Sequence, residues 1–154
     1  MILVDSNNRL ELKIVGYQFA GRNFGEYDDN WLLISISVDH PKGSWTSTDA
    51  CLLTWEVEWL AKWLRSVAEN PDVKREEAFI EPNLRFELLN ESEWKLRVYF
   101  ELEFRPNWAP GDGAGMDDLW VEFKPQPRDL LAAAASLMED LDKFPQRGSS
   151  LRTR

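Results

Sequence analysis

A twelve-residue segment of strictly alternating character, WKLRVYFELEFR at positions 94–105, most constrains how this chain can fold. Apolar side chains occupy every even position, and charged side chains or a tyrosine occupy every odd position. Successive side chains of a β-strand point to opposite faces, so the pattern predicts one long strand with a dry face and a wet face. A wet face is typical of antiparallel sheets, because parallel sheets are normally covered on both sides. The segment therefore predicts an antiparallel sheet.

The same alternation predicts strands elsewhere in the chain. Four segments show it, around 10–14, 32–38, 84–88 and 119–124. After Gly16 the first of these patterns changes phase by one residue, which suggests a β-bulge. Short edge strands are expected in three further segments, at 2–4, 43–47 and 77–80.

Two segments carry helical periodicity, at about 54–69 and 127–143. Thr54 is expected to cap the first helix, with Asp49 as a competing cap that would add about one turn. The helix is expected to end near Asn70, since the residue before a proline is pushed out of helical geometry. The order of strands, helix, strands and helix predicts an α+β two-layer domain, a mostly antiparallel sheet with both helices packed on one face.

The first predicted helix has an unusually broad apolar surface. Trp55, Trp59 and Trp63 recur every four residues beside a stripe of smaller apolar side chains. Together they span roughly 200° of the helix, about twice what a surface helix needs. The commoner interpretation is that a loop or a second element covers the tryptophans. The alternative is a scaffold or regulatory module that docks a partner protein through this tryptophan band.

Length and composition predict a single domain. The 154 residues suit one hydrophobic core, which we place at residues 1–145, and the basic tail at 146–154 has little to bury and is expected to fray. No apolar run approaches the roughly 20 residues that a membrane-spanning helix requires. The start of the chain lacks the features of a signal peptide, and Cys51 is the only cysteine, so we expect a reducing, cytoplasmic setting.

The net charge is −9, which argues against nucleic-acid binding. An acidic surface repels phosphate backbones, and no cluster of lysines and arginines offsets it. Such a surface favours basic partners, although plain solubility is its commoner purpose.

Catalytic patterns are weak throughout. His40 is the only histidine, and nothing around Cys51 suggests that the two form a nucleophile pair. Glu101 and Glu103 would lie on one strand face like a glycosidase pair, but ion pairing on a wet sheet face explains them better. Asp112, Asp117 and Asp118 lack the alternating ligands of a calcium loop. We therefore predict no enzyme, no cofactor and no metal.

Four segments in order, NWLLISISV, WTSTDACLLTWEVEWLAKWL, FIEPNLRFELL and LRVYFELEFRPNW, resemble the WapI family of bacterial immunity proteins. The resemblance covers about residues 1–145, and TDACLLTWEVEWLAKWL and RVYFELEFRP are its most specific parts. Ala50 stands where the family pattern has proline, a departure that affects entry into the helix more than function. The family has no catalytic motif, so no active-site residue is transferred.

The resemblance implies a cytoplasmic protein that binds and neutralises the toxic C-terminal domain of a bacterial polymorphic toxin. Such toxins are often nucleases, and an acidic protein can cover a basic, phosphate-binding surface. A tyrosine amid charges on the wet sheet face, together with two acidic loops at 20–30 and 105–118, is the hypothetical contact surface. Its candidate residues are Tyr99, Glu101, Glu103, Arg85, Glu87, Asp28, Asp29, Asp112, Asp117 and Asp118.

Overall fold

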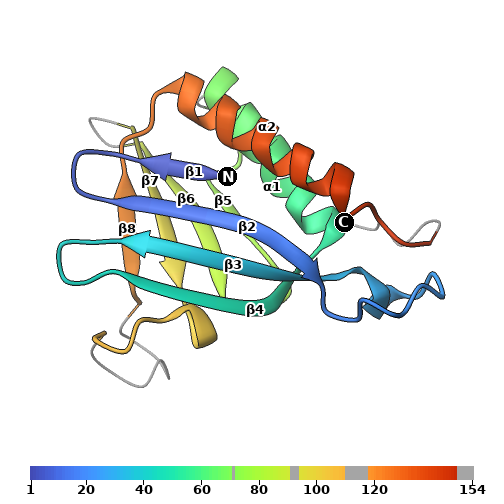
Figure 1. The fold of residues 1–154 in the computed structure, drawn as a ribbon. Coiled ribbons are helices and arrows are strands. Elements are labelled where there is room, and N and C mark those ends of the chain that lie inside the picture. Colours follow the sequence, from blue (N-terminus) through green and yellow to red (C-terminus); the bar gives the residue numbers. More distant parts are fainter. Residues whose placement is uncertain (71, 91–93, 110–117, 149–154) are drawn as a thin grey trace.

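The computed structural model describes residues 1–70, 72–90, 94–109 and 118–148, which form two four-stranded antiparallel sheets and two helices (Figure 1). The first sheet has the order β1-β2-β3-β4 and the second the order β5-β6-β7-β8, each strand next to its neighbour in sequence. The bounds of the first four strands are Ile2–Val4, Arg9–Tyr17, Trp31–Asp39 and Trp45–Leu53. The bounds of β5 to β8 are Glu76–Ala78, Leu84–Asn90, Trp94–Phe100 and Trp120–Phe123.

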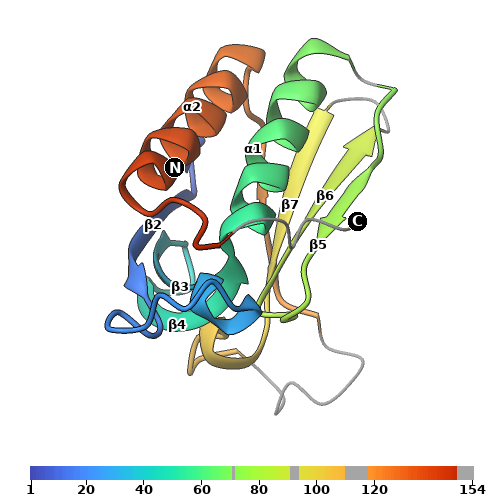
Figure 2. The ribbon, with the colours of Figure 1, turned by 90° about the vertical axis from the view of Figure 1, so that its right-hand side faces the viewer.

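The predicted α+β class, with antiparallel strands and two helices packed together, is confirmed, but the strands form two sheets rather than one. The chain leaves the first sheet at Leu53, runs through α1, Thr54–Glu69, and then begins the second sheet. α1 and α2, Pro127–Lys143, lie side by side along the same side of the molecule (Figures 1 and 2). The inward faces of both sheets and of both helices share one hydrophobic core.

The alternating pattern of the strands sets which side chains enter that core. Ile34 and Ile36 of β3, and Phe86 of β6, are buried, while their polar neighbours face outward. Gly16 coincides with a shift of register between β2 and β3, so the predicted β-bulge is confirmed. Every predicted strand exists, and β4 begins at Trp45 and runs on to Leu53, well beyond the expected 43–47.

The helix bounds also match their predictions, but the cap of α1 differs. Leu53 is the N-cap residue, and the Thr54 hydroxyl instead donates a hydrogen bond to Asn30 Oδ1 at 3.2 Å. Asp49 lies inside β4 opposite Ile34, so it cannot cap the helix. The Glu56 carboxylate, at the third position of the helix, accepts a hydrogen bond from the Leu53 N–H at 2.9 Å. In the described part of the chain, neither α1 nor α2 has the length and the hydropathy of a membrane-spanning segment.

The tryptophan band is mostly covered, as the commoner interpretation expected. Trp55 is 3% exposed and Trp63 is 6% exposed, while Trp59 is half-buried. The Trp63 indole donates a hydrogen bond to the Lys74 carbonyl at 2.7 Å, so the segment between α1 and β5 closes over it. A scaffold docking through this band would have little exposed surface to use.

The long strand predicted at 94–105 is wrong in its second half. β7 ends at Phe100, and a 3-10 turn, Leu102–Phe104, follows. Leu102 has a φ of 49° and is exposed, which is unusual for a residue with a side chain. The turn brings Phe104 into the core, where the Trp45 indole donates a hydrogen bond to its carbonyl at 3.0 Å. The sequence alternates through the turn as in a strand, so periodicity alone could not reveal it.

The burial of Trp63 predicts a stability test. Trp63→Ala should lower the free energy of unfolding by about 3–5 kcal/mol and the melting temperature by roughly 10 °C, because it leaves a cavity and an unpaired Lys74 carbonyl. Trp59→Ala is the matched control on the same helix, with an expected loss of less than about 2 kcal/mol. Chemical and thermal denaturation followed by circular dichroism measure both. Equal losses for the two variants would contradict the burial described here.

Candidate functional site

The outward face of the second sheet carries a cluster of aromatic and charged side chains around Tyr99. The Arg85 guanidinium lies 3.5 Å from the centroid of the Tyr99 ring, and the Tyr99 hydroxyl donates a 2.5 Å hydrogen bond to Glu87. Arg85 is opposite Tyr99 in the register of β6 and β7. Burial, and then the Glu87 carboxylate, raise the pKa of Tyr99. Arg85, Glu87 and Tyr99 are therefore brought together as predicted, but Tyr99 itself is covered by its neighbours.

Trp120 supplies the exposed aromatic surface that Tyr99 lacks. It lies opposite Tyr99 on β8, with the ring centroids 5.9 Å apart, and 42% of it is exposed. The Arg97 guanidinium lies 4.8 Å from the Trp120 ring centroid and donates a 2.6 Å hydrogen bond to Glu122. Stacked arginines and aromatics of this kind are typical of residues that dominate binding energy in protein interfaces.

Ion pairs hold this sheet face in one arrangement. Arg85 pairs with Glu76 and with Asp118, each at 3.3 Å, and Lys95 approaches Glu122 at 3.6 Å. The Arg97 hydrogen bond is the main cause of a lowered pKa of Glu122. The face carries both signs of charge, which favours a partner surface with its own mixture of charges and apolar contacts.

Glu101 and Glu103 do not belong to this face, contrary to the prediction. They flank Leu102 in the turn after β7, beyond the end of the strand. Glu103 accepts a 3.0 Å hydrogen bond from the Asn83 side chain, and Glu101 lies 3.6 Å from Arg105. A glycosidase-like pair on one strand face is therefore absent at these two positions.

The predicted acidic loop residues fall into four groups. Asp28 is exposed, but Asp29 is fully buried and accepts hydrogen bonds from the Phe24 and Glu26 N–H groups at 2.7 and 3.2 Å. Burial opposes its ionisation, yet these donors and Arg22 together lower the pKa of Asp29. Asp29 is thus structural and offers no surface to a partner. Asp118 joins the sheet face, while Asp112 and Asp117 lie outside the described residues.

The two residues considered for nucleophilic chemistry lie apart. His40 is near the β3–β4 turn and stacks on Trp108 with the ring centroids 5.4 Å apart. Cys51 is fully buried near the other end of β4, and burial raises the pKa of its thiol. Within the described residues, no three histidine, cysteine, aspartate or glutamate side chains gather as a metal site would require.

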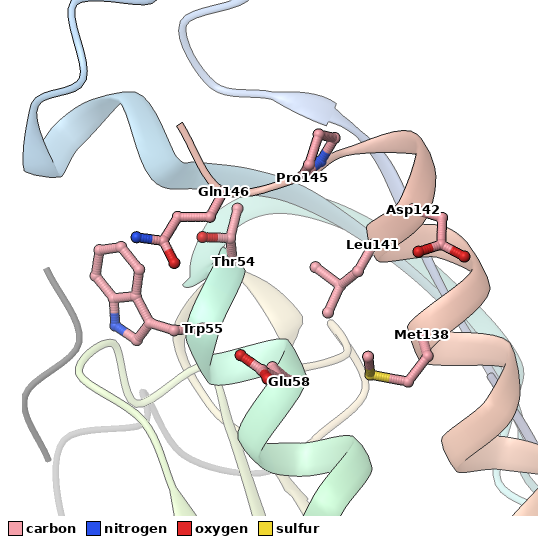
Figure 3. Close-up of a pocket in the computed structure, with 8 residues that line it drawn as sticks. All are labelled: Thr54, Trp55, Glu58, Met138, Leu141, Asp142, Pro145 and Gln146. Atoms are coloured by element: carbon pink, nitrogen blue, oxygen red, sulfur yellow. The ribbon is translucent and has the colours of Figure 1, made fainter. Parts of the chain in front are cut away.

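One pocket opens where the first turns of α1 meet the last turns of α2 (Figure 3). Its volume is about 170 Å³. Thr54, Trp55 and Glu58 line it from α1, and Met138, Leu141 and Asp142 line it from α2. Its lining combines two carboxylates with apolar side chains, and the Thr54 hydroxyl and the Gln146 amide add further polar groups.

Residues 1–145 of the chain match the model of a protein family described as the immunity protein WapI-like family. The chain belongs to the WapI-like immunity protein family. No curated protein matches the chain closely enough to be reported as a relative. Membership implies a cognate toxin as the partner, and proteins of an immunity family are generally non-catalytic. A site that binds a partner must lie on an exposed surface of this WapI-like protein.

Sequence reasoning missed two features of these surfaces. Trp120 and Glu122 alternate with the buried Val121 and Phe123, and that phase could have placed them beside Tyr99 once β8 was paired with β7. The second feature is Phe24, an exposed aromatic side chain in the loop between β2 and β3. It could not be recognised in this way, because a loop has no periodicity from which exposure can be inferred.

The ion pair of Arg97 with Glu122 predicts a pH effect. In the parent protein the pKa of Glu122 should lie below its ordinary value of 4.5, and Arg97→Gln should raise it. A carboxyl group whose pKa is lower in the folded than in the unfolded chain stabilises the fold at a pH above the unfolded pKa. This contribution to stability is lost as the pH falls through the folded pKa. NMR titration of the side-chain carboxyl carbons measures the shift.

Lys95→Gln is the matched control for this pair, since the Lys95 ammonium lies farther from Glu122 than the Arg97 guanidinium does. It should raise the pKa of Glu122 by less. An identical titration curve for Glu122 in the parent and in Arg97→Gln would contradict the arrangement of this face.

Proposed function

We propose that this chain binds the toxic C-terminal domain of a bacterial polymorphic toxin in the cytoplasm and neutralises it by masking its working surface. The match of the WapI-like immunity family over residues 1–145 carries the proposal. The toxin is inhibited because the bound chain covers its working surface in a stable complex. No covalent bond is made or broken.

The outward face of the second sheet is the proposed centre of the contact. Trp120 offers an exposed aromatic ring whose position is set by Arg97 and Tyr99. Side chains that are fixed before binding lose little conformational entropy when the complex forms. Two ion pairs, of Arg85 with Glu76 and of Arg97 with Glu122, supply polar groups for the rim of an interface.

The toxin domain is proposed to be basic, as a nuclease would be. The chain carries a net charge of −9, so a positively charged partner is steered toward it during diffusion. Such steering raises the association rate most at low salt. It also supports a protein target over a nucleic acid, whose phosphates the same charge repels.

Growth rescue tests the proposed function directly. The chain is co-expressed with the toxic domain encoded beside its own gene, and rescue together with a stable purified complex is the expected result. An inactive toxin variant controls for expression burden. Continued growth arrest, with both proteins soluble and the toxin active, would reject that pairing.

Trp120→Ala tests the location of the contact. Because exposed aromatic residues dominate many interfaces, the variant should weaken binding of the toxin domain by about 30-fold, which corresponds to about 2 kcal/mol. Leu131→Ala is the matched control, since Leu131 is 41% exposed and belongs to α2 and not to this sheet. Isothermal titration calorimetry measures both, after thermal denaturation has shown that neither variant is unfolded. Unchanged affinity for Trp120→Ala would remove this face from the interface.

A further inference from the structure

The loop of residues 18–30 between β2 and β3, here called the aromatic loop, exposes three aromatic side chains. Phe24 is 77% exposed, and Phe19 and Tyr27 are also exposed. The Arg22 guanidinium lies 5.0 Å from the Phe19 ring centroid and 5.9 Å from that of Phe24. Exposed aromatic patches on a folded protein commonly mark contact surfaces.

The aromatic loop is fastened from inside by buried polar groups. Asp29 accepts hydrogen bonds from the Phe24 and Glu26 N–H groups and pairs with Arg22 at 3.2 Å. The Asn30 side chain, also buried, donates a hydrogen bond to the Glu26 carbonyl at 3.1 Å. These hydrogen bonds fix the backbone around Phe24. The exposed position of its ring is therefore set by the fold of the loop.

The segment after α2 binds the same loop from outside. The Arg147 guanidinium donates hydrogen bonds to the Phe19 and Ala20 carbonyls at 2.9 and 3.3 Å and to the Arg22 carbonyl. Its backbone exchanges two further hydrogen bonds with the Asn30 side chain. The start of the predicted frayed tail is thus bound to the loop, while residues 149–154 lie outside the described part of the chain.

Two glycines allow this close approach. Gly25 and Gly148 both have positive φ values, of 80° and 81°. A Cβ atom on Gly148 would lie 2.5 Å from the Gly25 carbonyl oxygen, so a side chain there would separate the two segments. The segment 145–148 therefore serves as a strap across the aromatic loop.

The pocket between the helix ends is continuous with this loop. The Tyr27 and Trp55 rings lie edge to face with their centroids 5.2 Å apart, and Trp55 forms one wall of the pocket. Figure 3 shows Met138 and Leu141 facing it from α2, and Pro145 of the strap at its edge. The walls are thus apolar on both sides, with room for one side chain.

Carboxylates lie at the edge of this apolar pocket. Asp142 and Glu58 line it, and Asp28 is exposed on the neighbouring aromatic loop. Glu58 pairs with Lys62 at 2.8 Å, whereas Asp142 makes no ion pair with any described residue. The carbonyl groups at the end of α2 add partial negative charge on the same side. An apolar pocket with carboxylates at its edge suits the aliphatic stem and the charged head of an arginine or lysine.

We propose that the pocket and the aromatic loop form a second contact surface, which accepts a protruding arginine or lysine of the protein partner while Phe24 packs beside it. This inference rests on the proposed function, because the partner is taken to be the same toxin domain. It adds a second anchor, on α1, α2 and the aromatic loop, to the anchor on the second sheet.

Methionine methyl NMR locates the contact without any mutation. The chain is labelled at the methionine ε-methyl groups and saturated with the toxin domain encoded beside its gene. The Met138 signal is expected to shift, because Met138 lines the pocket, while the signal of Met1, buried beside the first sheet, stays in place. An unchanged Met138 signal in the saturated complex would overturn the proposal.

Two variants test the same surface by affinity. Phe24→Ala should weaken binding about tenfold and Asp142→Asn about threefold, the latter with a weaker dependence on salt. Ile80→Ala and Glu139→Gln are the matched controls, an exposed apolar residue and an exposed carboxylate of α2 outside the pocket. Both controls should bind like the parent chain.

The outcomes separate this surface from the proposed function. Parent-like affinity for Phe24→Ala and for Asp142→Asn, with Trp120→Ala still impaired, would overturn the second surface and leave the immunity function standing. Failure of the parent chain to bind the toxin domain would overturn the proposed function, and this surface with it.

Discussion

The wide apolar surface of α1 contributes to one hydrophobic core shared with both sheets. Each sheet has one apolar face, which must be buried against another element for the sheet to be stable. α1 is such an element, because Val57, Leu60 and Leu64 enter the common core while Trp55 and Trp63 close its sides. A narrower helix would leave the space between the two sheets unfilled.

Glu56 joins this helix to both sheets. Its carboxylate accepts hydrogen bonds from the N–H of Leu53, at the end of β4, and from that of Ile80, between β5 and β6, at 2.9 and 2.8 Å. Burial raises the pKa of Glu56, and the two backbone donors oppose the rise. The carboxylate thus satisfies two backbone groups where the chain passes from one sheet to the other. With the inner faces committed to the core, only outer faces and loops remain for binding a toxin.

Periodicity predicted the helices and most strands, because an element buried on one face has apolar residues at regular intervals in its sequence. It failed where local backbone geometry decides the outcome, as at Leu102, whose turn keeps an alternating pattern while the strand has ended. It could not show that Asp29 turns inward to bind backbone N–H groups, since exposed and buried carboxylates look alike in sequence. The number of sheets was likewise hidden, because alternation fixes faces and not pairing partners.

We propose that this protein inhibits its toxin by occupying it and does not alter it chemically. Titration of toxin activity with increasing amounts of the purified chain tests this most directly. Stoichiometric inhibition requires that toxin activity falls linearly to a fixed molar ratio and that longer incubation does not lower it further. Progressive loss of toxin activity at substoichiometric amounts would reveal turnover and contradict inhibition by occupation alone.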